Sequence, residues 1–328
     1  MLKIRKEYLY IIGNGFDLYH GLDTRYQSFA NFLKDRNWEV YDLAIEYYYL
    51  PDIAHQDDIE NDEYNAWSKF EEALSNLDYE QVLEDKSDYA ANLYDPDFRD
   101  RDWHSYQIEM EMIVDKLTKD LINIFKDFIL HINYPNQIGS EKISIHRNSL
   151  FLNFNYTDTL ERYYDIRIES ICYIHNKASE DNEIILGHGI NPKNFKPQKI
   201  EPPKDLSEEE YEMWREDMSD KYDYSYESAK SEILEYYEKS FKNSNEIIKQ
   251  NEHFFERLRN IKNVYVLGHS ISDVDLKYFI KVKESIKKNA IWNISYHSEK
   301  EKDKHFETLV KIGIERTKIY QIKIEELK

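Results

Sequence analysis

The feature that most constrains this chain is the stretch at residues 7–29, EYLYIIGNGFDLYHGLDTRYQSF. Residues 8–12 form a short apolar run of aromatic and β-branched side chains, as a buried strand requires. Gly13-Asn14-Gly15 ends the run, and two glycines one residue apart let the backbone turn sharply and approach a ligand. A helix that follows such a turn supplies N–H groups and a dipole that attract anions. The stretch therefore predicts a strand, a glycine turn and a helix, with an anion site at the turn.

The glycine turn by itself is open to two interpretations. It is shorter than the dinucleotide fingerprint G-x-G-x-x-G, because Leu18 stands where the third glycine would be. An acidic ribose-binding residue at the usual spacing is not evident either. A tight strand-to-helix turn without a ligand would have the same residues. The later strand ends must therefore decide between a nucleotide site and a purely structural turn.

Composition excludes several classes of protein. The 328 residues can bury a sizeable core, and 41% hydrophobic with 33% charged residues indicates a soluble globular protein. The net charge of −20 repels a phosphate backbone, so nucleic acid is not an expected partner. The single Cys172 permits neither an internal disulfide nor a thiolate zinc cluster. The first apolar run is too short for a signal peptide and no window reaches the length of a membrane span, so we expect a cytoplasmic protein without a membrane partner.

Apolar runs that alternate with helical patterns predict the fold. The expected strands are residues 8–12, 148–155, 170–175, 183–186, 263–269, 290–296 and 318–324. Helical periodicity covers residues 17–50, 65–77, 103–132 and 302–312, and a capping box at Ser207 starts a charged helical segment that reaches residue 259. Ser272 or Asp273 is placed to cap a helix after residue 269. This order predicts an α/β fold, with a Rossmann-like, doubly wound, mostly parallel sheet. We expect one domain over residues 1–328, with large helical insertions at about 27–133 and 205–261.

Polar side chains follow several of the expected strands. Asn155 ends the second strand, His175 ends the third, and His188 follows the fourth. Because ligands of open α/β sheets bind beyond the carboxyl ends of the strands, these residues are expected near Asn14. A single histidine there is more simply structural, whereas two histidines and two asparagines favour a shared site. Glu71 and Glu72 lie on the flank of the helix at 65–77, where a solvated position is the simpler interpretation and the rim of a pocket, for one of them, is the alternative.

Five segments taken together resemble the AbiH family of bacteriophage abortive-infection proteins. They are IIGNGFDLYHGLDTRYQSF, FNYTDTLE, YIHN, ILGHG and VLGHSISDVDL, which extend from residue 11 to about residue 276. The family in turn looks like a distant relative of the sirtuin-type NAD-binding fold. The resemblance implies an antiphage role and a nucleotide site, with NAD as a substrate and not as a bound cofactor. The helical segments between the motifs carry no signature of the family.

The resemblance also implies roles for individual residues. Gly13, Asn14 and Gly15 would hold the dinucleotide phosphates, Asn155 would position water or the ribose, and His175 would act on the ribose. The other residues that it places around the nucleotide are Asp17, Tyr156, Thr157, His188, Gly268, His269, Ser270 and Asp273. The chain departs from the sirtuin pattern in its shorter glycine turn and in Asn176, which replaces a glycine after the histidine. One cysteine cannot form the four-cysteine zinc module of sirtuin deacylases, so cleavage of NAD by water is the implied activity.

Cleavage of the nicotinamide–ribose bond gives the ribose oxocarbenium character and requires a positioned water. Asn155 can orient that water, because an amide both donates and accepts hydrogen bonds. Neutral His175 can accept a proton near pH 7, and His188 and His269 are the alternatives for this role.

Two other functions stay open at this point. The chain could be a nucleotide-binding sensor or assembly module without catalysis, in which the helical insertions carry the function. A weaker alternative is a metal-dependent nuclease or phosphatase that uses Asp17, His188, His269 and Asp273, although no tight spacing such as H-E-x-x-H supports it. Beyond NAD or a related nucleotide, the partners considered are a second copy of the chain and a phage-derived trigger.

Overall fold

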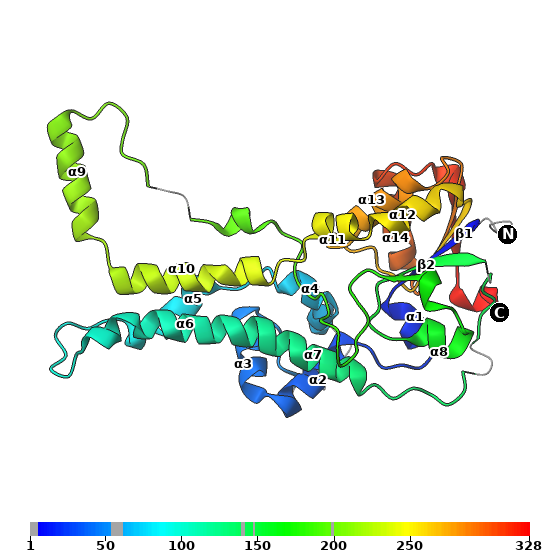
Figure 1. Cartoon of the computed structure of the whole chain (residues 1–328), viewed down its shortest axis with the longest axis horizontal. Helices are drawn as coiled ribbons and strands as arrows, with labels where there is room; N and C mark the ends of the chain where they lie inside the picture. Colours follow the sequence, from blue (N-terminus) through cyan, green and yellow to red (C-terminus); the bar gives the residue numbers. More distant parts are fainter. Residues whose placement is uncertain (1–5, 54–61, 139–141, 147, 198–199) are drawn as a thin grey trace.

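The computed structural model describes residues 6–53, 62–138, 142–146, 148–197 and 200–328. A parallel sheet lies at one end of the molecule, and helices extend from it as a long arm (Figure 1). The described strands form one six-stranded, all-parallel sheet in the order β3-β2-β1-β4-β5-β6. They are β1 (Tyr8–Ile12), β2 (Ser149–Asn153), β3 (Ile171–Tyr173), β4 (Asn263–Leu267), β5 (Ile291–Ser295) and β6 (Ile319–Ile322). This order confirms the predicted Rossmann-like α/β fold.

β1 is the centre of the sheet. Its first residue, Tyr8, pairs with Ser149 of β2 on one side and with Asn263 of β4 on the other. The strand order reverses between β1 and β4, and ligands of doubly wound sheets bind at the carboxyl side of such a reversal. The glycine turn therefore follows the strand that borders the reversal.

Helices cover both faces of the sheet. One face is covered by α1 (Asn14–Tyr19) and α8 (Thr159–Tyr164), and the other by α11 (Ser244–Gln250), α12 (Glu252–Glu256), α13 (Leu276–Ser285) and α14 (Glu299–Lys311). Side chains alternate between the two faces along β1. Leu9 and Ile11 pack toward the second set of helices, while Tyr10 and Ile12 pack toward the first.

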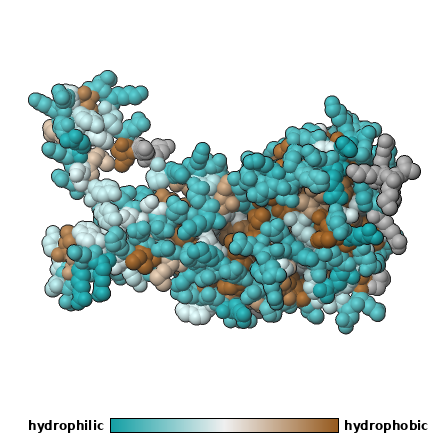
Figure 2. All heavy atoms as spheres, viewed as in Figure 1, coloured by the Kyte–Doolittle hydropathy of each residue, from teal (hydrophilic) through white to brown (hydrophobic). Residues whose placement is uncertain are grey.

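The arm consists of helices that precede β2 or lie between β3 and β4. They are α2 (Tyr26–Arg36), α3 (Trp38–Tyr47), α4 (Phe70–Ala73), α5 (Tyr79–Asp85), α6 (Ser105–Asp115), α7 (Leu121–Leu130), α9 (Glu208–Asp220) and α10 (Tyr224–Lys239). At the far end of the arm α9 stands apart from the rest, and in space-filling view it forms a separate knob (Figures 1 and 2). Within the described residues, no helix is long and apolar enough to cross a membrane.

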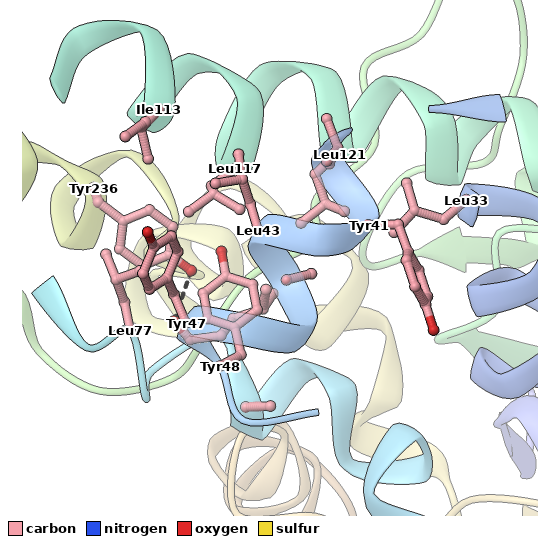
Figure 3. Packing of buried hydrophobic residues seen from close by; sticks show 14 of the residues in the cluster. Leu33, Tyr41, Leu43, Tyr47, Tyr48, Leu77, Ile113, Leu117, Leu121 and Tyr236 are labelled. Atoms are coloured by element: carbon pink, nitrogen blue, oxygen red, sulfur yellow. Dashed lines mark hydrogen bonds between the residues drawn. The ribbon is translucent and has the colours of Figure 1, made fainter. Parts of the chain in front are cut away.

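The arm has a hydrophobic core of its own. A π-helical turn at Lys116–Asp120 joins α6 to α7, so the two form one continuous rod, as the periodicity of residues 103–132 predicted. Tyr47 and Tyr48 at the end of α3 lie beside Leu117 of the rod and Tyr236 of α10 (Figure 3). The Tyr236 hydroxyl donates a 2.7 Å hydrogen bond to the carbonyl of Leu74, which satisfies its polar group inside this core.

Several predictions of local structure were wrong. Residues 183–186 form no strand, because the Ile185 N–H donates to the His175 carbonyl while Ile184 and Leu186 pack into the core of the arm. Residues 65–77 hold only the four-residue α4 after a 3-10 helix at Asp62–Lys69. The helix after residue 269 begins at Leu276 with Asp275 as its N-cap residue, and neither Ser272 nor Asp273 takes that position.

Residues 17–50 are mostly helical, as predicted, but three helices, α1, α2 and α3, divide this segment. Gly21 has a φ of +79°, which lies outside helical conformation and separates α1 from α2. Asn37 separates α2 from α3, because its side chain accepts a hydrogen bond from the Val40 N–H and so caps α3.

Candidate active site

The glycine turn after β1 packs directly against the loop after β4. The Gly13 N–H donates to the Leu267 carbonyl at 3.0 Å, and the Gly15 N–H donates to the Gly268 carbonyl at 2.7 Å. A Cβ on Gly13 would lie 2.6 Å from the Cα of His269, and one on Gly268 would lie 2.1 Å from the Phe16 nitrogen. The glycines therefore allow two backbones to touch, and in this conformation the N–H groups of Gly13 and Gly15 are bonded to protein carbonyls.

Asp17 fastens the glycine turn to the loop after β2. Its buried carboxylate accepts hydrogen bonds from the hydroxyls of Thr157, at 2.5 Å, and Thr159, at 2.7 Å. Burial raises the pKa of Asp17 to about 6, although the hydrogen bonds from Thr157, Thr159 and Asn155 oppose this rise. The Asn155 amide donates to the Gly13 carbonyl at 3.0 Å. Asn14 likewise bonds within its own loop, with both its amide and its carbonyl oxygen engaged by Thr24.

A second polar group lies nearby and joins the sheet to the helices. We call it the Lys242 cluster, and its members are Glu71, His175, Lys242, His269 and Asp275. His175 and His269 follow the carboxyl ends of β3 and β4, and Asp275 caps α13. Glu71 comes from α4, and Lys242 lies between α10 and α11. Side chains from the arm and from the sheet therefore meet in one place.

The Lys242 ammonium is the centre of this cluster. Its side chain is fully buried, and Nζ lies 2.6 Å from Glu71 Oε2 and 3.0 Å from Asp275 Oδ1. Glu71 also accepts a 2.6 Å hydrogen bond from the Tyr26 hydroxyl. Burial by itself lowers the pKa of Lys242, but attraction to Asp275 and Glu71 outweighs burial and raises the pKa above its ordinary value. With one ammonium and two carboxylates, the cluster has a net charge of −1 when both histidines are neutral.

The two histidines face different oxygens of Asp275. His269 Nδ1 accepts a hydrogen bond from the Ile271 N–H at 2.9 Å, so the ring proton lies on Nε2, which is 3.6 Å from Asp275 Oδ2. His175 bonds to the Phe154 backbone, while its Nε2 is buried without a hydrogen-bond partner 3.8 Å from Asp275 Oδ1. Nε2 of His175 is therefore the ring nitrogen that remains available to a hydrogen-bonding ligand.

Both rings are neutral at physiological pH. Burial, followed by repulsion from Lys242 and His269, lowers the pKa of His175 well below its ordinary value. Burial and then Lys242 lower the pKa of His269 to about 3. Asp275 Oδ1 is within ion-pair distance of Lys242 but has no hydrogen-bond partner of its own. The cluster therefore offers a buried base and a carboxylate oxygen to a group that could donate hydrogen bonds or carry positive charge.

The structure separates the predicted site residues into four sets. Gly13, Asn14, Gly15, Asp17, Asn155, Thr157 and Gly268 form the contact between loops. His175 and His269 belong to the Lys242 cluster, and Tyr156 lies beside it, with its ring near His175 and its hydroxyl donating to the Ile185 carbonyl. Ser270 and Asp273 are exposed on the loop before α13. His188 is buried among Phe195, Tyr237 and Phe241, and its carbonyl accepts from the Lys242 N–H.

Sequence reasoning did not find Lys242 or Asp275. Lys242 follows a helix rich in charged residues and has no local feature that marks it as buried. Asp275 lies two residues after Asp273, in the segment VLGHSISDVDL, and the aspartate that faces the histidines is the second one. Glu71 was weighed as a residue of a pocket rim, and the structure places it on the buried ammonium.

Among the described residues, the structure provides no set of metal ligands for a metal-dependent nuclease or phosphatase. Within the described residues, no group of three or more histidine, cysteine, aspartate or glutamate side chains has an arrangement that could hold a metal ion. Asp17, which that alternative required, is occupied by two threonine hydroxyls.

Comparison with known proteins gives one result. The family model described as "Bacteriophage abortive infection AbiH" matches residues 9–296, which is most of the chain. Neither a curated protein nor a solved structure matches the chain significantly.

Proposed function

Because this chain belongs to the bacteriophage abortive infection AbiH family, we propose that it acts against phage by hydrolysing NAD at the nicotinamide–ribose bond. The observation that carries this proposal is His175 Nε2, which is buried without a hydrogen-bond partner at the carboxyl edge of the sheet, 3.8 Å from the Asp275 oxygen that pairs with Lys242. Buried polar atoms normally have hydrogen-bond partners inside proteins. A buried polar atom without such a partner therefore points to a ligand that supplies the missing hydrogen bond.

Electrostatics favour a substrate with a positive reacting end. The Lys242 cluster has a net charge of −1, and all its members except the partly exposed Glu71 are buried, so charge acts there with little screening. The nicotinamide ring of oxidised NAD carries a positive charge, and the ribose becomes cationic as the bond breaks. A carboxylate such as that of Asp275 stabilises both charges and can also accept hydrogen bonds from ribose hydroxyls.

The proposed reaction uses groups of this chain for each transfer. Water attacks C1′ of the ribose while the C1′–N bond breaks, and the bonding electrons neutralise the nicotinamide ring as it leaves. The proton of the attacking water goes to His175 Nε2. Nicotinamide and ADP-ribose are the products. Asn155, to which the resemblance assigns the water, donates its amide to Gly13, and we therefore assign the water to His175 and Asp275 instead.

The main test is nicotinamide release by the purified full chain, with His175→Ala and Asp275→Asn beside the wild type. Loss of a general base lowers rates by about 10²- to 10⁴-fold, so each variant should lose release by that factor. His253→Ala is the matched control, because the His253 side chain is 89% exposed on α12 and is not a member of the Lys242 cluster. Release that survives in His175→Ala would contradict the assignment of the base.

One observation favours a nucleotide sensor as a second candidate. His175 Nε2 and Asp275 Oδ1 are out of contact with solvent, so a ligand has to displace the arm from the sheet in order to reach them. A sensor would use the same opening without chemistry. An increase in melting temperature with NAD, but without nicotinamide release, would favour the sensor, whereas no increase and no release would mean that NAD is not the ligand.

A further inference from the structure

The α9 helix lacks the tertiary contact that normally stabilises a helix of its length. It has 13 residues and a capping box between Ser207 and Glu210, but none of its residues is buried. Isolated helices of about this length are marginal in water, and most helices in proteins gain their stability from a packed apolar face. Figure 2 shows the helix as a knob separated from the body of the molecule.

α9 has an apolar stripe that is partly exposed in the described structure. Tyr211, Trp214 and Met218 have the spacing that places them on one face, and the rings of Tyr211 and Trp214 stack with centroids 6.0 Å apart. The rest of the helix is strongly acidic, with seven acidic residues and one basic residue, which gives 1 − 7 = −6. A surface that covers this stripe therefore needs apolar groups surrounded by positive charge.

The chain itself provides such a surface, at the amino-terminal edge of the sheet. We call it the basic edge and define it by Lys6, Arg257, Arg259, Lys287 and Lys288, which precede β1, β4 and β5. Backbone bonds hold these segments together, because the Lys262 N–H donates to the Glu7 carbonyl and the Lys287 N–H to the Ile261 carbonyl. Burial and then repulsion from Arg257 lower the pKa of Lys6, as expected for two cations that lie near each other.

The basic edge has unbalanced charge and exposed apolar groups. Among the described residues, no carboxylate lies within ion-pair distance of its five cations, although Lys262 and Lys318 beside them pair with Glu7 and Glu315. Ile168 and Ile291 lie at the same edge, where 48% and 38% of their surface is exposed. The five cations of the edge carry a charge of +5 beside exposed apolar groups, a combination that is complementary to that of α9.

The two surfaces cannot meet within one molecule. α9 lies at one end of the long axis, and the amino end of β1, next to Lys6, lies at the other (Figure 1). We propose that α9 of one copy docks on the basic edge of a second copy. Each copy then uses two different surfaces, α9 toward one neighbour and the basic edge toward the other. Contacts of this kind repeat head to tail and build open chains or closed rings. The net charge of −20 opposes association only weakly, since salt screens charges beyond about 8 Å under physiological conditions.

The experiment is sedimentation velocity of the full chain over a wide concentration range. Species larger than a dimer should grow with concentration and should shrink in about 1 M salt, where the screening length is about 3 Å. Trp214→Ser with Asp217→Lys should weaken the association about tenfold or more. Met213→Ser with Glu216→Lys is the matched control, because it makes the same chemical changes on the opposite face of α9 and should have no effect.

Variants of the basic edge make the test specific for head-to-tail contact. Arg259→Glu with Lys288→Glu should weaken the association as much as the α9 variant does, while Lys304→Glu with Lys311→Glu on α14 should not. An equimolar mixture of the α9 variant and the edge variant retains one intact contact, so it should form a dimer and nothing larger. A monomeric wild type, a dimer that survives both variants, or an edge variant that associates normally would each overturn the proposal.

Discussion

Replacing Lys242 by methionine should destabilise the protein more than removal of any exposed lysine. The substitution keeps most of the buried side-chain volume but removes the only ammonium that contacts Glu71 and Asp275 in the described structure. Two carboxylates would then be left without a cation in a site where Lys242 itself has no exposed surface. Removing one partner of a buried ion pair typically costs about 3–5 kcal/mol.

The expected change in melting temperature follows from the size of the chain. At about 2.1 cal/mol/K per residue, the unfolding entropy of 328 residues is about 0.7 kcal/mol/K. A loss of about 3–5 kcal/mol therefore lowers the Tm by about 4–7 °C. Calorimetry measures this change, and urea unfolding followed by tryptophan fluorescence gives the free energy independently.

Lys239→Met is the matched control for this prediction. Lys239 is only three residues away, but it is 36% exposed and lies 3.9 Å from both Asp115 and Glu232. Exposed pairs of this kind contribute about 0.2–1 kcal/mol. Adding Glu71→Gln and Asp275→Asn to Lys242→Met should recover most of the stability, because no lone charge is then buried. A loss in Lys242→Met no larger than that in Lys239→Met would refute the reasoning.

Three further predictions concern the rest of the site. Gly268→Ala should lower the free energy of unfolding by about 2 kcal/mol or more, because φ is +64° and the new Cβ would lie 2.1 Å from a backbone nitrogen. Gly313→Ala is the control and should cost about 1 kcal/mol, because φ is +88° there but the Cβ meets only the flexible end of Lys283. Urea unfolding measures both values. Thr159→Val should cost about 1.5–3 kcal/mol through its lost bond to Asp17, and equal stability of this variant and the exposed Thr308→Val would contradict the anchoring role. The free energy of unfolding should fall as the pH drops from 6.5 toward 3, by up to about 1.4 kcal/mol per pH unit for His269, because the unfolded ring binds a proton that the buried ring, with its pKa of about 3, does not. His269→Gln should flatten this slope and exposed His253→Gln should leave it unchanged, as measured by urea titrations at several pH values.

The parts of the fold that sequence predicted are those whose residues are buried on every side. β1 and the middle of β2 are apolar because helices cover both faces of the sheet, and a run of this kind has few other interpretations. The run at residues 183–186 has a similar local pattern, but its apolar side chains pack into the core of the arm. Only the residues that it contacts in the folded structure distinguish it from a strand of the sheet. Local pattern thus predicts burial better than it predicts hydrogen-bond partners.

The candidate site was predicted only in part for a related reason. His175 and His269 were found because strand ends can be located in a sequence. Lys242 and Glu71 belong to helical insertions whose placement over the sheet depends on tertiary packing, and a buried lysine has the same letter as the many exposed ones. The glycine turn was predicted as a turn, but its close contact with Gly268 involves residues about 250 positions away.

The central position of β1 has a consequence for the order of synthesis. Its neighbours are Ser149 and Asn263, which follow Tyr8 by 149 − 8 = 141 and 263 − 8 = 255 residues. A growing chain therefore keeps its first strand without a partner until Ser149 has been made, and with one open edge until Asn263 has been made, and such a strand needs protection from aggregation. Tyr26 and Glu71 are likewise synthesised long before Lys242 and Asp275, with which they are linked in the folded protein. A chain released early from the ribosome would thus lack the Lys242 cluster altogether, so only a nearly finished molecule can acquire the chemistry proposed for it.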